Sequence, residues 1–439
     1  MQTNSTGLSH KRVLGVAIPI VLANATIPIL GAVDTAVVGQ LGLAVPIGAV
    51  GIGAIILTAI YWLFGFLRMG TTGLTAQAIG SGDKPETSAL LVRGIIIGLV
   101  AGLVLIIAQV PIFLGALQLS PASMEVEGLA QKYLQIRVYS APAAIALFGI
   151  TGWLIAKEKT RAVLLLQLVL NGINIALDLV FVLKLGWGVE GVAIATLIAE
   201  WSGLIFGLWL AREGFNNGYW RNWVQIFDRA RLLQMAKINS DIMIRSILLE
   251  IGFVSFLFLG SSFDDLTLAA NQVLIQFLHI TAYALDGFAF AAEAIVGQAL
   301  GAKNRPLFRR AVIMTSQWGL GSSIVMALAF FVFGNSIINV MTTAEDVRVV
   351  SYEYLPWMVL GPLAGVAAWM LDGVFIGATR TADMRNMMFI SFCIYLIALA
   401  LLLPNYGNHG LWASLIIFSI ARGVTLGFKY PALEKSSEH

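Results

Sequence analysis

Twelve apolar stretches, each long enough to cross a bilayer as a helix, dominate this chain of 439 residues. A helix needs roughly 20 apolar residues to span about 30 Å of hydrocarbon. The stretches lie near residues 13–38, 44–67, 87–114, 128–155, 162–183, 189–211, 232–259, 266–290, 310–334, 350–376, 386–403 and 409–427. Only 12% of the residues are charged and the mean hydropathy is +0.85, which excludes a soluble globular protein. The chain is therefore predicted to be an all-α polytopic membrane protein.

The basic residues predict the orientation of these spans. An even number of spans places both termini on the same side of the membrane. Most of the 27 Lys and Arg residues fall in the two termini and in the loops between even-numbered and odd-numbered spans, so both termini are expected in the cytoplasm. The first apolar run is too long and too polar for the core of a cleaved signal peptide, and it is expected to remain. The net charge of +3 is ordinary for such a protein and gives no reason to expect a nucleic-acid partner.

The sequence predicts no cofactor. The single Cys393 cannot form an internal disulfide, and no cluster of Cys and His has the spacing of metal ligands. Neither half has a Gly-rich turn ending in Lys-Ser or Lys-Thr, so ATP is not expected to drive the activity.

The chain resembles itself when it is shifted by 221 residues. The shift pairs Gly39 with Gly260, Gln77 with Gln298, Gly80 with Gly301, Tyr133-Leu134 with Tyr354-Leu355, and Gly152 with Gly373. A constant offset over more than a hundred residues predicts a duplicated six-helix bundle. Because six is even, the copies have the same orientation, as in transporters that rock two bundles about a central site. The predicted domains are an N-terminal lobe (1–211), a cytoplasmic interfacial linker (212–231), a C-terminal lobe (232–428) and a tail (429–439).

Two local patterns predict packing. In the linker, "REGFNNGYWRNWVQIFDRAR", aromatic residues alternate with charges, which predicts a helix lying in the cytoplasmic interface or a plain amphipathic linker. In the third span, Gly94, Gly98 and Gly102 form a stripe of small residues that lets a neighbouring helix approach closely.

The fifth span carries a polar stripe inside an otherwise apolar run. Gln167, Asn171, Asn174 and Asp178 are spaced by four, three and four residues, so they share one helix face. A lone intramembrane Asn usually hydrogen-bonds to another helix. An aligned stripe that ends in an acid instead favours the lining of a water-accessible cavity.

The first span supplies the expected partner of this stripe. It contains Asn24 and Asp34, and it also contains Pro19 and Pro28, which predict a helix that can bend. In the sixth span Thr196 and Glu200 share a face, although Glu200 could simply lie near a membrane surface.

The repeat offset shows that the acidic cluster of the first and fifth spans belongs to the N-terminal half only. Asp34 corresponds to Ser255, Asn174 to Tyr395 and Asp178 to Leu399. A charge at the bilayer centre costs about 2.5 to 3.5 kcal/mol on insertion scales, and two neighbouring carboxylates repel, so at least one is expected to bind a proton near neutrality. This is the chemistry of proton coupling.

The C-terminal half has a polar line of its own in the eighth span. It consists of Gln272, Gln276, His279, Tyr283, Asp286 and Glu293. Together with Arg245 and Glu250 in the seventh span and Asp372 in the tenth, it could form a cation site or a second ion relay. The alternative is an interhelical network of salt bridges and hydrogen bonds that holds the bundle rigid.

At these residues the chain resembles the multidrug and toxic compound extrusion (MATE) family, and within it the DNA-damage-inducible bacterial branch. The resemblance rests on the motifs "GAVDTAVVGQLG", "GLTAQAIGSGD", "NGINIALDLVFVLKLGWGVEGVAIAT" and "LDGVFIGATRTADMRN". It implies two six-helix lobes in a bacterial inner membrane and export of cationic or amphipathic drugs in exchange for protons or sodium ions.

The resemblance also implies roles for particular residues. Asp34, Asn174 and Asp178 would form a proton-responsive site, Thr196 would lie beside it, and Pro19 would bend the first helix. Other branches of the family use acids on the seventh and tenth helices to bind a cation, and Glu250 and Asp372 occupy such positions. The other partners expected are membrane lipids, and a monomer is expected.

The leading hypothesis is therefore drug/proton antiport, in which Asp34 and Asp178 hold either a proton or a cationic compound. Asn171, Asn174, Gln167, Thr196 and Asn24 would contribute to the binding of that compound. One alternative is sodium-coupled antiport through Glu250, Asp372 and Asp286. Another is a flippase for lipid-linked saccharides, which would favour a basic cavity. An intramembrane aspartyl protease is a further alternative, but its acid pair would already belong to the transport site, and the protein is not expected to be an enzyme.

Overall fold

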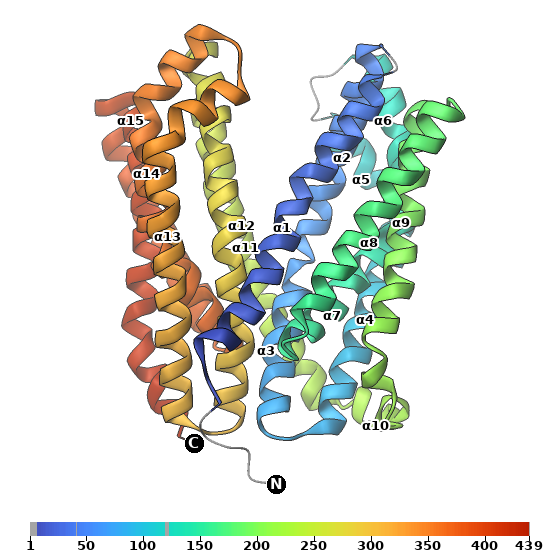
Figure 1. Ribbon diagram of the computed structural model, residues 1–439, viewed down its shortest axis with the longest axis vertical. Coiled ribbons are helices and arrows are strands. Elements are labelled where there is room, and N and C mark those ends of the chain that lie inside the picture. The colour runs from blue at the N-terminus through green and yellow to red at the C-terminus, as the bar shows by residue number, and fades with distance from the viewer. Residues whose placement is uncertain (1–6, 41, 119–122, 439) are drawn as a thin grey trace. The chain divides into compact units, whose positions relative to one another are not determined.

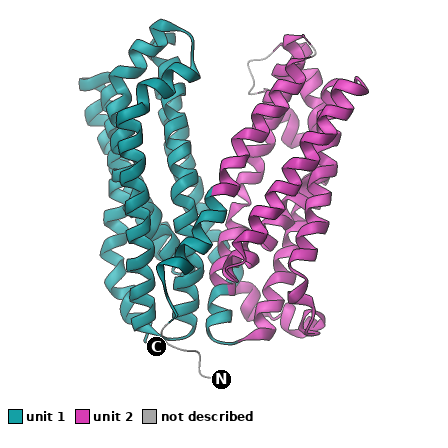
Figure 2. Cartoon of the chain, viewed as in Figure 1, with its two compact units in different colours: residues 1–21, 76–82, 234–439 teal, residues 22–75, 83–233 magenta. Residues whose placement is uncertain are grey.

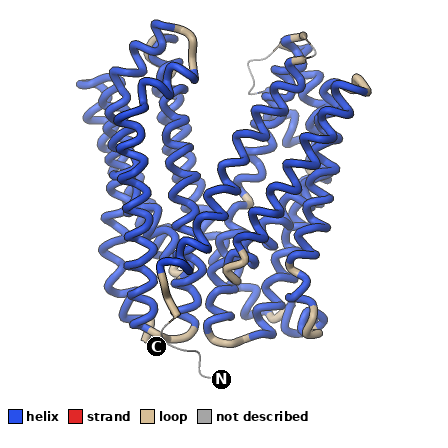
Figure 3. The backbone as a smooth tube through the Cα atoms, viewed as in Figure 1, coloured by secondary structure: helices blue, strands red, loops and turns tan. Residues whose placement is uncertain are grey.

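The computed structural model describes residues 7–40, 42–118 and 123–438, and within these residues every regular element is a helix (Figures 1 and 3). The N-terminal half contains α1 (His10–Gly39), α2 (Ala44–Leu63), α3 (Gly65–Gly80), α4 (Lys84–Ile107), α5 (Gln109–Gln118), α6 (Met124–Arg137), η1 (Val138–Ser140), α7 (Ala141–Ala156), α8 (Thr160–Asp178), η2 (Leu179–Lys184) and α9 (Gly188–Leu210). The remainder contains η3 (Arg212–Phe215), η4 (Tyr219–Arg221), α10 (Trp223–Ile226), α11 (Arg229–Gly260), α12 (Asp265–Gly301), α13 (Arg305–Met341), α14 (Glu345–Gly377) and α15 (Thr381–Ser436). The predicted all-α membrane fold is confirmed.

The predicted spans correspond to these helices. Eleven helical segments of the described chain are long and apolar enough to cross a membrane. The last of them, α15, contains the two final predicted spans, and Gly407 separates these with a non-helical backbone (φ 53°, ψ −130°). Glycine adopts this left-handed conformation without the steric penalty of a Cβ atom. The eleven helical segments of the described chain therefore correspond to the twelve predicted spans, because α15 contains two of them.

Two compact units make up the chain (Figure 2). Unit 1 comprises residues 1–21, 76–82 and 234–439, and unit 2 comprises residues 22–75 and 83–233. Unit 1 has an apolar core contributed by α11 to α15, and unit 2 has one contributed mainly by α1, α2, α6 and α9. Helices α1 and α3 each contribute residues to both units, so the chain passes between the units within these helices as well as near residue 233.

The repeat predicted from the sequence is visible as equivalent contacts. In unit 2 a Cβ on Gly152 would collide with the backbone carbonyl of Arg68. In unit 1 a Cβ on Gly373 would collide with the backbone carbonyl of Ala289. Because each of these residues in unit 2 lies 221 positions before its counterpart in unit 1, the same helix crossing is built twice from the same glycine.

The small residues of α4 pack as predicted. A Cβ on Gly94 would lie 3.2 Å from the Cα of Gly149 on α7, and Cβ atoms on Gly98 and Gly102 would overlap the backbone of α7 at Ala146 and Pro142. Close contact between the two backbones therefore depends on glycine at these positions.

The linker differs from the prediction. Instead of one helix over 212–231, it forms the short turns η3, η4 and α10, so the expectation of a single helix is wrong. Gly218 has a φ of 71°, which ends helical geometry between η3 and η4. The Asn-Asn-Gly sequence that precedes η4 favours a turn over a helix.

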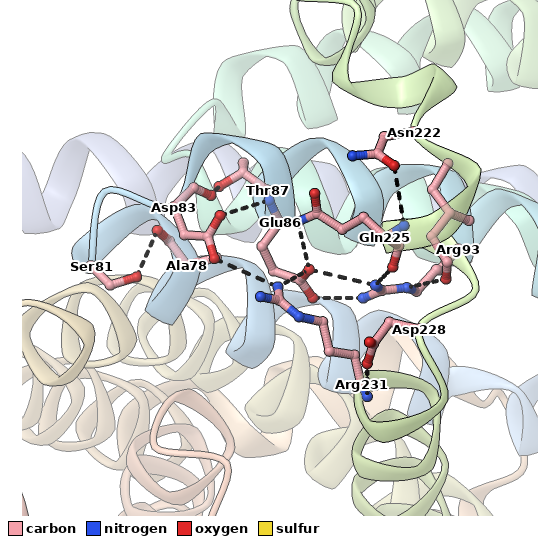
Figure 4. Close-up of polar contacts among 11 residues, drawn as sticks. Ala78, Ser81, Asp83, Glu86, Thr87, Arg93, Asn222, Gln225, Asp228 and Arg231 are labelled. Carbon is pink, nitrogen blue, oxygen red and sulfur yellow. Dashed lines mark hydrogen bonds and ion pairs between the residues drawn. The ribbon is translucent and has the colours of Figure 1, made fainter.

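Ion pairs fasten the end of the linker to α4 (Figure 4). The fully buried Arg93 donates to Glu86 Oε1 (2.6 Å) and to the backbone carbonyls of Gln225 (2.5 Å) and Ile226 (2.7 Å). Arg231, near the start of α11, pairs with the second carboxylate oxygen of Glu86. The linker thus belongs to unit 2 through charge-assisted hydrogen bonds.

Candidate functional site

The polar stripe on α8 joins that helix to α1. Gln167 Nε2 donates to Asn171 Oδ1 (3.0 Å), and Asn171 Nδ2 donates to Thr26 Oγ1 on α1 (2.9 Å). Thr26 in turn donates to the carbonyl of Ala23 (2.7 Å). This part of the stripe is a chain of hydrogen bonds between helices.

The C-terminal part of the stripe brings two acids to one amide. The orientation of an Asn amide is assigned from its partners. One orientation of Asn174 satisfies three neighbours: its nitrogen donates to Asp178 Oδ2 (2.8 Å) and Asp34 Oδ1 (3.1 Å), and its oxygen accepts from Thr196 Oγ1 (2.8 Å). The carboxyl groups of Asp34 and Asp178 are also within hydrogen-bonding reach of each other. Helices α1, α8 and α9 therefore meet at a cluster of two carboxyl groups, one amide and one hydroxyl. We call Asp34, Asn174, Asp178 and Thr196 the acid site.

Burial at the acid site is uneven. Asn174 and Asp178 have no exposed surface, Thr196 is 7% exposed, and Asp34 is half-buried. Asp178 Oδ1 is buried without a hydrogen-bond partner. The predicted water-accessible cavity therefore does not reach Asn174 or Asp178 in this conformation.

The backbone changes its geometry directly after Asp178. Residues Leu179–Lys184 form a π-helical turn, in which the amide of Leu185 donates to the carbonyl of Val180 (2.9 Å). Such turns within α-helices are frequent at functional sites. No pattern in the sequence predicted this feature.

A buried ion pair lies next to the acid site. Arg137 Nη1 on α6 lies 3.0 Å from Glu200 Oε2 on α9, one helical turn beyond Thr196. Arg137 also donates to Ser140 Oγ (3.0 Å) and to Tyr133 Oη (3.3 Å). Its charge is within electrostatic range of both Asp34 and Asp178.

Sequence reasoning did not pair Arg137 with Glu200, because helical spacing shows which side chains share a face but not which helices are neighbours. The only available signal was that Arg137 follows Tyr133 by four residues, as Glu200 follows Thr196, which places each residue on the same face as a polar neighbour.

The other predicted residues on α1 lie in different surroundings. Asn24 is half-buried on the part of α1 that belongs to unit 2. Pro19 is buried in unit 1 and Pro28 is exposed in unit 2, while α1 is a single helix over both.

The acids proposed for a C-terminal cation site do not share one environment. Asp372 on α14 is buried and accepts from Arg422 Nη2 (2.7 Å) and from Arg245. Glu250 is exposed and Asp286 is half-buried. The polar line on α12 is exposed at its beginning, at Gln272, Gln276 and His279, and becomes buried at Glu293. Arg422, which sequence reasoning did not single out, completes an Arg–Asp–Arg cluster.

The position equivalent to the acid site is neutral in the C-terminal half. Ser255 and Tyr395, the counterparts of Asp34 and Asn174, hydrogen-bond to each other through their hydroxyl oxygens (3.0 Å). Leu399, the counterpart of Asp178, is buried in the apolar core of unit 1. The duplication therefore preserves the contact between the helices but not its charge.

A duplicated bundle of membrane-crossing helices, with the Asp34–Asn174–Asp178 cluster in only one half, is the arrangement of a secondary transporter. A family model described as MatE matches the chain twice, at residues 19–180 and 242–402. The chain belongs to this family, and it is a multi-pass MATE-family efflux transporter.

Relatives of known sequence agree with this assignment. The chain is 38% identical over 423 residues to DNA damage-inducible protein F of Escherichia coli K12, which covers 95% of this chain and 91% of the relative. It is 24% identical to the probable multidrug resistance protein NorM of Bacillus anthracis, with 97% of this chain and 95% of that protein covered.

Solved structures share the fold. The Vibrio cholerae MATE transporter VcmN, solved as a mutant, superposes with a TM-score of 0.86 at 23% identity and 97% coverage of each chain. A MATE protein in a bent conformation superposes with a TM-score of 0.88 at 18% identity, covering 98% of this chain and 97% of the other.

Proposed function

We propose that this protein exports cationic or amphipathic compounds in exchange for protons, and that the acid site couples the two movements. The observation that supports this most directly is the position of Asn174, whose amide nitrogen faces both carboxyl groups. Two carboxylates held this close repel each other when both are ionised. Sharing one proton removes the repulsion, and the pair then titrates as a unit.

The buried oxygen of Asp178 adds a reason for a proton and a cationic compound to compete for the acid site. Asp178 Oδ1 has no protein donor. An unpaired charged oxygen in a low-dielectric interior is unfavourable. A proton on the acid, or a cation close to it, relieves that penalty, so both species compete for the same carboxyl groups.

Competition for one site produces exchange. When the site faces the cytoplasm with at least one acid ionised, it attracts a cationic compound that apolar walls also hold. When it faces outward, proton uptake neutralises the acids and weakens the grip on the cation. Because one pKa unit corresponds to about 1.4 kcal/mol, one or two units of coupling would change the affinity for the compound roughly tenfold to a hundredfold.

Protons are favoured over sodium because of the surroundings of Asp372. Two guanidinium groups already neutralise this carboxylate, and their positive charge would repel a third cation. Glu250 is exposed on a different helix. The C-terminal acids therefore resemble the rigid network more than a cation site.

The test is transport of a fluorescent cation by protein reconstituted in vesicles, with the proton and sodium gradients imposed separately. We expect a proton gradient alone to drive transport, Asp34→Asn to abolish it, and Glu250→Gln to leave it unchanged. Transport that follows the sodium gradient and is lost in Glu250→Gln would replace this proposal with sodium antiport. The comparison requires the Asp34→Asn protein to remain folded. Its melting temperature in detergent checks this.

The proposal extends to location and assembly. We propose that the protein works as a monomer in a bacterial inner membrane with both termini in the cytoplasm, where lipids surround it. Labelling of single cysteines introduced near the two termini, from either side of the membrane, tests that orientation.

A further inference from the structure

A cavity of about 630 Å³ lies in unit 1 at the start of α13, far along the chain from the acid site. Its walls come from the beginning of α1, the first three turns of α13, and the end of α15 with the residue Glu438 beyond it. The cavity takes no part in the proposed coupling, and its lining combines arginines with apolar side chains.

The arginines of the cavity are only partly neutralised. Arg305 pairs with Glu438 (2.6 Å) and with Glu434 (3.5 Å), which engages both acids of the lining. Arg309 reaches Glu434 only at 4.0 Å, and its side chain is 67% exposed. Arg310 is exposed and makes no ion pair within the described chain. Two guanidinium groups therefore remain able to bind an anion.

Further features of the cavity favour an anion. The indole of Trp318 donates to His10 Nδ1 (3.1 Å), so His10 carries its proton on Nε2 and presents a donor rather than an acceptor there. The arginines also lie in the first two turns of a long helix, α13, whose dipole favours negative charge at that end.

The apolar part of the wall points to a lipid rather than a small soluble anion. Pro306, Arg310, Ile313 and Gln317 follow one face of α13, so the charged turn continues directly into apolar surface. Ile313 is 47% exposed, and Leu320 farther along the same helix is 48% exposed. Helix α13 is long and apolar enough to span the membrane, so its exposed apolar surface is where acyl chains would lie.

From these contacts we propose that the cavity binds the headgroup of an anionic phospholipid, with its phosphate on Arg309 and Arg310 and its acyl chains along α13. Guanidinium groups bind phosphate oxygens through paired hydrogen bonds, and basic pockets at the membrane surface are a known mode of lipid recognition. This binding does not depend on the coupling ion and does not require the acid site.

The test measures lipid binding to the full-length protein in neutral detergent by native mass spectrometry. The probes are dioleoylphosphatidylglycerol, dioleoylphosphatidylcholine and soluble glycerol phosphate. We expect wild type to retain one tightly bound phosphatidylglycerol in preference to phosphatidylcholine, and the double variant Arg309→Gln with Arg310→Gln to lose affinity for it by on the order of tenfold or more. Both arginines are exposed, so the variant should keep the wild-type melting temperature.

The matched control is the double variant Arg229→Gln with Lys237→Gln, which removes two exposed positive charges outside the cavity. We expect it to bind phosphatidylglycerol as the wild type does. Three results would overturn the proposal: unchanged phosphatidylglycerol affinity in the cavity variant, an equal loss in the control, or binding of glycerol phosphate as tight as that of the intact lipid. The last result would make the cavity a site for a soluble anion.

Discussion

At the scale of single residues, Asn174 organises the acid site. Its amide contacts Asp34, Asp178 and Thr196 at distances of 2.8 to 3.1 Å, and it has no exposed surface. The position of both carboxyl groups therefore depends on one side chain that carries no charge.

We expect Asn174→Ala to lower stability by about 1 to 3 kcal/mol, because it leaves buried acceptors without a donor. Thr196→Val removes one hydrogen bond at the edge of the site and should cost about 1 kcal/mol. Melting temperatures of the purified variants give the order, and efflux of a fluorescent cation should fall in the same order. A larger loss in Thr196→Val than in Asn174→Ala would show that the amide does not hold the acids.

Helical spacing was sufficient to place Asn174 and Asp178 on one face of the fifth span, and the family resemblance implied that Asp34 and Thr196 lie beside them. Sequence reasoning did not pair Arg137 with Glu200 or place Arg422 beside Asp372, because helical spacing does not show which helices are neighbours. Their burial depends on partners from other helices, at 3.0 Å for Arg137 with Glu200 and 2.7 Å for Arg422 with Asp372. Such contacts between helices depend on the three-dimensional fold and cannot be read from local sequence patterns.

At the scale of elements, the close approach of α4 and α7 depends on glycine. A Cβ on Gly98 would overlap the backbone of Ala146, whereas nothing lies within 4 Å of a Cβ built on Gly172 in α8. Backbone atoms cannot move aside as the end of a flexible side chain can, so overpacking here separates two helices.

We therefore expect Gly98→Ala and Gly172→Ala to change stability in opposite directions. Gly98→Ala should destabilise the protein by roughly 1 to 3 kcal/mol through overpacking. Gly172→Ala should be neutral or stabilising by up to about 1 kcal/mol, because alanine is the better helix former. Thermal unfolding in detergent measures both, and a stabilised Gly98→Ala would contradict the packing described for α4 and α7.

The turn η3 is held by an ion pair that depends on pH. Hydrogen bonds from Lys157 (2.7 Å) and Lys159 lower the pKa of Glu213 from 4.5 to about 2. A carboxyl whose pKa is lowered in the folded state contributes stability that is complete above its unfolded pKa. That contribution is lost as the pH falls from about 4.5 to about 2. Because Glu213 is half-exposed, we expect only about 0.5 to 1 kcal/mol.

Hydrogen exchange at Gly214, whose amide donates to the carbonyl of Ala211 (2.9 Å), measures this contribution. Exchange in the wild type should accelerate relative to the intrinsic rate as the pH falls through that window. Glu213→Gln should show fast exchange that does not change across the window. An identical pH profile in both proteins would assign the stability of the turn to other contacts.

The linker shows why element boundaries were harder to predict than spans. A span of apolar residues has one favourable state in a bilayer, namely a helix. The backbone N–H and C=O groups of the linker can hydrogen-bond to water, to side chains or within turns. Its conformation depends on Gly218 and on the hydrogen bonds that Arg93 donates to the carbonyls of Gln225 and Ile226. The alternation of aromatic and charged residues over 212–231 therefore reflects the contacts that these residues make, and it does not indicate a single helix.

At the scale of the whole molecule, the two halves share helix crossings but not the acid site. The contacts of Gly152 and Gly373 with equivalent carbonyls show that duplication preserved the helix crossings. The acid site was not preserved, since Ser255 and Tyr395 keep only a neutral hydrogen bond in its place. The positions equivalent to Arg137 and Glu200 are Met358 and Ala421, so the neighbouring ion pair is also absent.

This asymmetry leads to a prediction about moving the site. The triple variant Ser255→Asp, Tyr395→Asn and Leu399→Asp would copy the acids and the amide into the C-terminal half. There they would lie in an apolar core that includes Met358 and Phe418, without a counterpart of Arg137. Burying unpaired carboxyl groups among such residues costs several kcal/mol. We expect a strongly reduced melting temperature and no return of proton-driven efflux when the triple variant is combined with Asp34→Asn.

The single variant Ser255→Asp separates a coupling defect from misfolding, because Ser255 lies at the edge of that core and is only partly buried. Combined with Asp34→Asn, it should fold and still fail to couple transport to the proton gradient. If either variant restored proton-driven efflux, acids alone would be sufficient for coupling in this scaffold. The surroundings supplied by Asn174 and by the Arg137–Glu200 pair would then be dispensable, and the coupling mechanism proposed for the N-terminal half would have to be rebuilt without them.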